Sequence, residues 1–300
     1  MENGESPAPE ETGIRPITDR EFSLFQELIY KEAGIYLSGA KKPLLEGRLS
    51  RRMRELGLHS FNAYYHRVLE QGEAERVRLL DAVSTNETHF FREPLQFEFL
   101  ERRLFPEWAR EAELGRRPRK IRAWSAGCSS GEEPYSLAMT LLFHFPSTSG
   151  WNVEIFATDL STRMLERARN PIWPIEKTKE IPPQYLKPFM LRGTRSQEGK
   201  IKAGPEIRSV VRFDRLNLNE DGYPFSGPFD LIFCRNVLIY FDTESKKRVL
   251  DRLLRSLSPA GHLFIGHAES LTGLGDRVRS VIPTVYMKGG SESAEWSKKS

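Results

Sequence analysis

The sequence predicts an α/β fold, a doubly wound and mostly parallel sheet, preceded by a small all-helical domain. Three observations lead to this prediction. From residue 121 onward, short apolar runs alternate with amphipathic helical segments, as in sheets built from βαβ units. The run over 121–126 leads through a glycine-containing loop directly into a helical segment. Before residue 84, apolar residues recur at helical spacing in four short segments with brief connections.

The composition is that of a globular protein, with 39% hydrophobic and 29% charged residues. No apolar run approaches the ~20 residues that a membrane span needs, and the acidic first residues are unlike a signal peptide. Cys128 and Cys234 stand far apart and match no metal or disulfide pattern. We therefore expect a cytoplasmic protein without a metal. Its net charge of +4 indicates an acidic partner, either a protein, a membrane or a nucleic acid.

The first helix is predicted to begin after Thr18, because Thr18 and Glu21 have the spacing of a capping box, and to end near Gly34. Ser60 suits the N-cap of a third helix. The second and fourth helices are expected over residues 41–56 and 73–83. Many cations lie on the second helix: Lys41, Lys42, Arg48, Arg51, Arg52 and Arg54. Such a run is usually a solvated face, and the alternative is a docking surface for an acidic partner.

The stretch Ser84–Pro94 is polar, then aromatic, then basic, and fits no single period. Loops of this mixture often carry function, and the alternative is a linker that packs its two phenylalanines. A helical pattern resumes at Leu95. Further along, strands are expected at 121–126, 153–157, 210–213, 229–234 and 262–266, an extended segment at 278–287, and helices at 134–145, 162–169 and 243–257. Between Asn170 and Glu206, prolines break the pattern and indicate an insertion with its own small β element.

The loop after the first strand suits a small charged ligand, because its backbone N–H groups and the positive helix end point at one spot. Gly127 and Gly131 let the chain turn sharply there. Glu132 and Glu133 stand where a phosphate-binding loop needs a lysine, so an ammonium group or sugar hydroxyls fit better than a phosphate. The alternative is an ordinary turn between a strand and a helix.

Ligands of doubly wound sheets bind beyond the carboxyl ends of the strands, where further candidates collect. Asp159 could bind both hydroxyls of a ribose, or could cap the following helix. The pair Asn217-Leu218 could offer an amide and an apolar edge to a purine, and Arg235-Asn236 follow the next apolar run. This set fits S-adenosylmethionine better than a dinucleotide, for which no G-x-G-x-x-G run is present.

These motifs resemble the CheR family of chemotaxis receptor methyltransferases, which are protein-glutamate O-methyltransferases. The resemblance covers about residues 18–288. It rests, in order, on Thr85–Arg92, Ala126–Ser136, Ala157–Asp159, Asn217-Leu218 and Cys234–Phe241. His89 departs from the family pattern, which usually has an aromatic or apolar residue there.

The resemblance implies a class I S-adenosylmethionine methyltransferase sheet with a small inserted β subdomain, after an all-α N-terminal domain. It implies the helical domain (15–84), a linker that contributes to the cofactor site (85–94) and the methyltransferase domain (95–288, with the insert at about 171–208). The polar composition of residues 1–14 and 289–300 predicts two disordered tails.

The same resemblance implies the site. S-adenosylmethionine is the cofactor and S-adenosylhomocysteine the product. The residues expected at the cofactor are Asn86, Thr88, Arg92, Glu132, Glu133, Asp159, Asn217, Leu218, Arg235 and Asn236. One of Glu132 and Glu133 is expected at the methionine part, and Glu133 is favoured.

The expected reaction is a single displacement, in which a receptor glutamate attacks the sulfonium methyl. That carboxylate is ionised at neutral pH, so no general base is needed. Arg92 and Tyr240 are candidates for holding it, although Tyr240 could instead be a core aromatic. The docking face for acidic receptor helices would comprise Arg48, Arg51, Arg52 and Arg54. We expect a monomer that meets the membrane only through its receptor and binds no nucleic acid.

Two other functions fit the sequence less well. A nucleic-acid methyltransferase would carry an Asn/Asp-Pro-Pro-aromatic motif after the fourth strand, where this chain has Arg235-Asn236-Val237-Leu238. An adaptor that has lost catalysis is disfavoured by the intact set of polar site residues.

Overall fold

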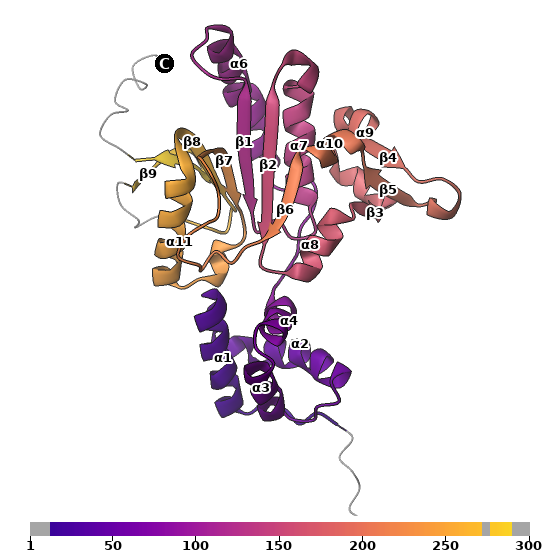
Figure 1. Ribbon diagram of the computed structural model, residues 1–300, viewed down its shortest axis with the longest axis vertical. Helices are drawn as coiled ribbons and strands as arrows, with labels where there is room; N and C mark the ends of the chain where they lie inside the picture. The colour runs from indigo at the N-terminus through magenta and orange to yellow at the C-terminus, as the bar shows by residue number, and fades with distance from the viewer. Residues whose placement is uncertain (1–12, 272–276, 290–300) are drawn as a thin grey trace, which may run out of the picture. The chain divides into compact units, whose positions relative to one another are not determined.

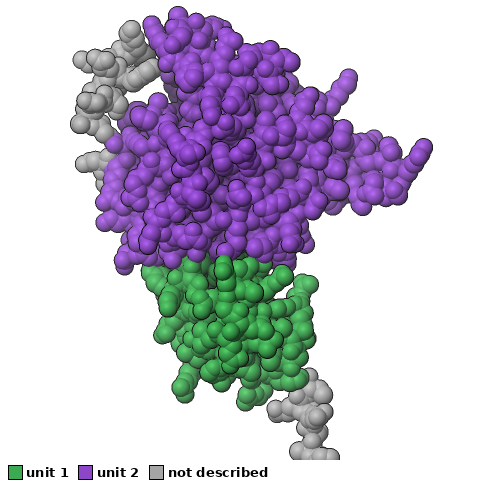
Figure 2. All heavy atoms as spheres, in the orientation of Figure 1, with its two compact units in different colours: residues 1–84 green, residues 85–300 purple. Residues whose placement is uncertain are grey.

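The structure is a computed structural model that describes residues 13–271 and 277–289. The chain divides into two units, residues 1–84 and residues 85–300 (Figure 2). The expected tails fall almost wholly outside the described residues. Among the helices that the structure describes, none is long and apolar enough to cross a membrane.

The first unit is helical, as predicted. Thr18 and Glu21 form the expected capping box, and Gly34 ends the first helix in the left-handed region at φ 69°. Ser60 caps the third helix by accepting a hydrogen bond from the Ala63 backbone N–H. The helices are α1 (Asp19–Ala33), α2 (Lys42–Glu55), α3 (Phe61–Glu70) and α4 (Glu73–Val83), with a 3₁₀ turn at Gly39–Lys41.

The second unit is built on a seven-stranded sheet (Figure 1). Its order is β6 (Val211–Arg215), β2 (Asn152–Asp159), β1 (Lys120–Ala126), β7 (Phe229–Cys234), β8 (Leu257–Ile265), β10 (Val285–Lys288) and β9 (Val278–Ile282). The first five strands are parallel, and β10 is antiparallel to both of its neighbours. The predicted doubly wound, mostly parallel sheet is therefore confirmed.

Apolar cores cover both faces of this sheet. Along β7, Leu231 and Phe233 enter one core, whereas Ile232 and Cys234 enter the other, as alternation along a strand requires. Helix α7 (Glu132–His144) packs in the first core and α11 (Thr243–Ser256) in the second. Helix α8 (Thr162–Arg169) lies against β2 and β6.

Several details differ from the sequence-based expectation, and β8 begins at Leu257 rather than at His262. Helix α7 begins at Glu132 rather than at Pro134, because Gly131 takes the N-cap position at φ 98° and proline is tolerated in a first helical turn. The extended segment over 278–287 is a hairpin of two antiparallel strands, with Thr284 at φ 68° in the turn.

The predicted small β element is present in the insert. A three-stranded antiparallel sheet has the order β3 (Ile172–Pro174), β5 (Lys200–Ala203), β4 (Met190–Arg192), and α9 (Pro183–Phe189) and α10 (Pro205–Ser209) accompany it (Figure 1). Trp173 and Tyr185 of the insert belong to the same apolar core as α7. Ahead of β1, the chain forms α5 (Pro94–Phe99), a π-helical turn (Leu100–Leu104) and α6 (Phe105–Glu113).

Candidate active site

Four loops with polar side chains leave the carboxyl ends of adjacent parallel strands. The strand register pairs Ala126 with Thr158 and Asp159 with Arg215, so the exits of β1, β2 and β6 lie at one edge of the sheet. Ser125, near the end of β1, is paired with Phe233 near the end of β7. The four predicted groups of site residues therefore meet at this edge.

The glycine loop after β1 packs closely against the loop after β7. Gly127 has φ 92°, and a Cβ built on it would lie 2.4 Å from a methyl carbon of Val237. Only glycine fits this position, both for its backbone angle and for the space it leaves. Residues 127 and 128 are tied to β2, since their backbone N–H groups donate to the Thr158 carbonyl at 2.8 and 2.9 Å.

Asp159 links two of the loops through its buried carboxylate. One oxygen accepts from the Ser129 backbone N–H and the other from the Ser161 backbone N–H, each at 2.8 Å. The N-cap of α8 is Ser161, whose hydroxyl accepts from the Met164 N–H. Asp159 thus holds the glycine loop and the start of α8 together.

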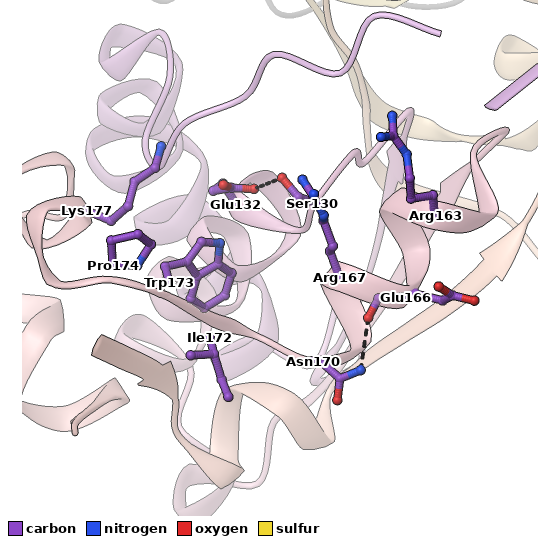
Figure 3. A pocket seen from close by; sticks show the side chains of 10 residues that line it. All are labelled: Ser130, Glu132, Arg163, Glu166, Arg167, Asn170, Ile172, Trp173, Pro174 and Lys177. Atoms are coloured by element: carbon purple, nitrogen blue, oxygen red, sulfur yellow. Dashed lines mark hydrogen bonds between the residues drawn. The ribbon is translucent and has the colours of Figure 1, made fainter. Parts of the chain in front are cut away.

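The structure separates the two neighbouring glutamates of α7. Glu133 faces the exits of β1 and β7, where it accepts from Ser125 Oγ and from Arg235 Nε, each at 2.6 Å. Glu132 accepts from Ser130 Oγ at 2.7 Å and faces a cavity of about 570 Å³ between α8, β3 and the following turn (Figure 3). Burial raises the pKa of Glu132. Neither Asp159 nor Asn236 lines this cavity. The cavity is therefore next to the place where the four loops meet and is not enclosed by them.

Arg235 is a buried hub that joins the linker to the sheet. Besides its bond to Glu133, its Nη1 donates to the Arg92 carbonyl and, at 3.2 Å, to Gln96 Oε1. Nη1 also lies 3.9 Å from a carboxylate oxygen of Glu93. The guanidinium carbon lies 5.5 Å from the centre of the Phe233 ring, a cation–π distance.

The linker residues lie against the glycine loop and α7. The Asn86 carbonyl accepts from Ser129 Oγ at 3.0 Å, and the Phe91 N–H donates to Ser136 Oγ at 3.0 Å. Arg92 donates to the Glu87 carbonyl at 3.2 Å. The residues on either side of Arg92, at 91 and 93, take left-handed backbone angles of φ 49° and 60°. Strained backbone of this kind often accompanies functional sites.

The remaining predicted residues lie in the linker and in the loops that follow β6 and β7. Thr88 is half-buried in the linker. The Asn217 side-chain oxygen accepts from the Asn219 N–H at 3.0 Å, and Leu218 is buried. Tyr240 is half-buried in the turn that follows Asn236.

Three buried polar residues of this site were not predicted: Glu93, Gln96 and Glu269. Apart from Glu93, the hydrogen-bond partners of Gln96 lie 139 to 188 positions away, so no local pattern marks it. Glu269 did carry a signal, because it follows the carboxyl end of β8, the neighbour of β7 in the sheet.

The four arginines of α2 differ in their partners within the first unit. Arg52 forms a bidentate ion pair with the buried Glu75, in which Nε and Nη2 donate to the two carboxylate oxygens at 2.9 and 2.8 Å. These hydrogen bonds raise the pKa of Arg52. Arg48 donates to the Val83 carbonyl. Arg51 and Arg54 are exposed, and Arg51 lies 3.7 Å from Glu55. Two of the predicted docking residues thus hold the helices of their own unit together.

Comparison with known families and relatives gives consistent matches over both units. A family model described as "CheR methyltransferase, SAM binding domain" matches residues 86–287, and one described as "CheR methyltransferase, all-alpha domain" matches residues 20–84. The "Chemotaxis protein methyltransferase" of Salmonella typhimurium is 40% identical over 260 residues, covering 86% of this chain and 86% of that protein.

Two further relatives are similar over nearly the whole chain. The "Chemotaxis protein methyltransferase" of Escherichia coli is 40% identical over 273 residues, covering 90% of this chain and 91% of that protein. The "Chemotaxis protein methyltransferase 2" of Pseudomonas aeruginosa is 39% identical over 273 residues, covering 90% and 93%.

Proposed function

Because this chain belongs to the CheR family of S-adenosylmethionine-dependent chemotaxis methyltransferases, we propose that it methylates glutamate side chains on the cytoplasmic helices of chemoreceptors. The products are glutamate methyl esters and S-adenosylhomocysteine. The reaction serves receptor adaptation in chemotaxis-type signalling. The protein works as a monomer in the cytoplasm and reaches the membrane through its receptor.

The observation that carries this proposal is an unsatisfied acceptor at the strand exits. Asn236 Oδ1 is buried and has no hydrogen-bond partner among the described residues. A buried polar atom without a partner costs ~1–3 kcal/mol, so a ligand that donates a hydrogen bond is favoured there. The next residue, Val237, touches the glycine loop at Gly127. An amide oxygen beside this loop suits the ammonium or hydroxyl groups of S-adenosylmethionine better than a phosphate.

We assign each part of the cofactor to the residues of one of these loops. Asp159 takes the ribose, and Asn217 with Leu218 takes the purine. Glu133 meets the methionine part, because it faces the exits of β1 and β7 whereas Glu132 faces the neighbouring cavity. The remaining contacts come from Asn86, Thr88, Arg92, Arg235 and Asn236. The charge of Arg235 is balanced by Glu133, so it adds little attraction for a phosphate.

The chemistry requires alignment more than proton transfer. S-adenosylmethionine supplies an electrophilic methyl group on a sulfonium sulfur. The substrate glutamate is already ionised at neutral pH, so the protein needs to hold the carboxylate in line and keep water away. Arg92 suits this task, because no carboxylate among the described residues forms an ion pair with it. Tyr240 is the second candidate for holding the substrate carboxylate.

We further propose that the exposed cations of α2 meet the acidic receptor helix. Arg51 and Arg54 present their charges to solvent, while Arg48 and Arg52 fix the helix on which they stand. Attraction of this kind mainly raises the rate of encounter and weakens with salt.

Transfer of labelled methyl groups tests the proposal. The protein is incubated with methyl-labelled S-adenosylmethionine and purified chemoreceptor cytoplasmic fragments, and the fragments are then treated with mild base. We expect volatile label to be released, because glutamate methyl esters are base-labile. Bound cofactor without transfer to any acidic helical receptor fragment would contradict the proposal. A gel shift on duplex DNA at physiological salt would favour a nucleic-acid substrate instead.

A further inference from the structure

Glu269 lies beneath the turn that carries Asn236. One carboxylate oxygen accepts from the backbone N–H groups of Asn236, at 2.9 Å, and Gly266, at 2.6 Å. The other oxygen accepts from the Ile239 N–H at 3.2 Å. Glu269 is 7% exposed, so these bonds are made away from solvent. One carboxylate thus joins the exits of β7 and β8.

The same turn confines the side chain of Asn236. Its backbone is left-handed, at φ 59°. A Cβ on Gly266 would lie 2.6 Å from Asn236 Nδ2, so the amide group sits in space that only glycine leaves open. The other end of that amide is the buried, unpartnered Oδ1. The backbone bond from Glu269 and the contact with Gly266 therefore fix where this oxygen lies.

We propose that Glu269 is a positioning residue for cofactor binding, which holds the turn 236–239 so that Asn236 presents its side-chain oxygen to the cofactor. The inference rests on the proposed function for the identity of the ligand. Glu269 follows a different strand, β8, and acts through Asn236 without touching the cofactor.

The chemistry of the carboxylate supports this assignment. Burial raises the pKa of Glu269, and bonds from backbone N–H groups act in the opposite direction. A buried carboxylate is costly to desolvate and is tolerated where several donors converge on it. An amide at this position would keep one acceptor oxygen and would turn an NH₂ group toward backbone donors. Glu269→Gln therefore changes the hydrogen bonding of the turn with little change in side-chain size.

The first test uses the cofactor-free protein. In Glu269→Gln, hydrogen–deuterium exchange at the N–H groups of Asn236, Ile239 and Gly266 should be faster than in the wild type, with exchange elsewhere in the sheet unchanged. The matched control is Glu154→Gln, whose carboxylate pairs with Lys120 and Arg122 on the same sheet. Unchanged exchange in the turn of Glu269→Gln would overturn the proposal.

The second test measures affinity for S-adenosylhomocysteine by titration calorimetry. Loss of a hydrogen bond to a charged group corresponds to roughly a tenfold or larger change in an equilibrium constant. Glu269→Gln should therefore bind S-adenosylhomocysteine about tenfold more weakly than the wild type. Glu154→Gln should match the wild type. Gly266→Ala should also weaken binding, because it displaces Asn236 while leaving the Glu269 carboxylate in place. Wild-type affinity in both turn variants would overturn the inference. A wild-type protein that fails to bind S-adenosylhomocysteine would instead refute the proposed function.

Discussion

Arg235 and Glu133 form a buried ion pair, with Nε 2.6 Å from Oε2, that ties the exit of β7 to the first turn of α7. Their side chains are 2% and 9% exposed. The pair lies where the linker, the glycine loop and the exit of β7 meet. It therefore links the stability of the second unit to the shape of the site.

Removing one member of this pair is expected to destabilise the protein. Arg235→Met leaves the Glu133 carboxylate buried without its charged partner, which costs about 3–5 kcal/mol of unfolding free energy. Denaturant unfolding of Arg235→Met, Glu133→Gln and the double variant measures the coupling. A double variant that loses the sum of the two single effects would show that the pair contributes no interaction energy.

Arg92→Ala should lose methyl transfer while keeping its fold. The side chain is half-buried and donates one bond to a backbone carbonyl, so the unfolding free energy should change by less than about 1 kcal/mol. Turnover should fall by at least about a hundredfold if Arg92 aligns the substrate carboxylate. Arg92→Lys keeps the charge without the planar fork and should recover part of the rate. Full turnover in Arg92→Ala would exclude the role.

The arginines of α2 should divide into two groups. Arg51→Glu and Arg54→Glu should raise KM for a receptor fragment and reduce its dependence on salt, with the melting temperature nearly unchanged. Arg52→Ala should instead destabilise the helical unit, because Glu75 loses its two-pronged partner and is only 3% exposed. Salt titrations of KM, combined with thermal melts, separate the two effects. An unchanged KM in both charge-reversal variants would argue against docking on this face.

The buried imidazole of His262 should make the stability of the protein depend on pH. Burial lowers the pKa of His262 to about 4, and its Nδ1 is buried without a hydrogen-bond partner in the described part of the chain. The unfolded chain, with a pKa near 6.5, therefore binds the proton more readily. Stability from this group is present above about pH 6.5 and is lost as pH falls toward 4, by about 2–3 kcal/mol. Unfolding of His262→Leu between pH 7 and 4 should show a correspondingly smaller loss, and an identical pH dependence would refute the assignment.

Local signals in the sequence predicted the elements well. The capping residues Thr18 and Ser60 mark helix starts that the structure confirms. The hairpin of β9 and β10 was not predicted, because its turn uses Thr284 at positive φ, where glycine or asparagine is the usual signal.

The arrangement of polar groups was harder to predict, because it depends on tertiary partners. The motifs indicated which strand exits carry polar residues. They did not indicate that Arg235 would be paired with Glu133, 102 positions away, or that Arg52 would be paired with Glu75. Glu93 and Gln96 were missed for the same reason, whereas Glu269 was marked by its place after β8. Periodicity reports which face of an element is buried, and it carries no information on which distant group meets a buried charge.

Mass spectrometry of receptor peptides would show whether this protein methylates chemoreceptors in cells. Chemoreceptors are isolated from cells with and without this protein, digested, and searched for glutamates that carry one added methyl group. We expect methylated glutamates on the cytoplasmic helices that disappear without the protein and return with the wild-type chain. The same set of methylated glutamates in both kinds of cell would contradict this expectation.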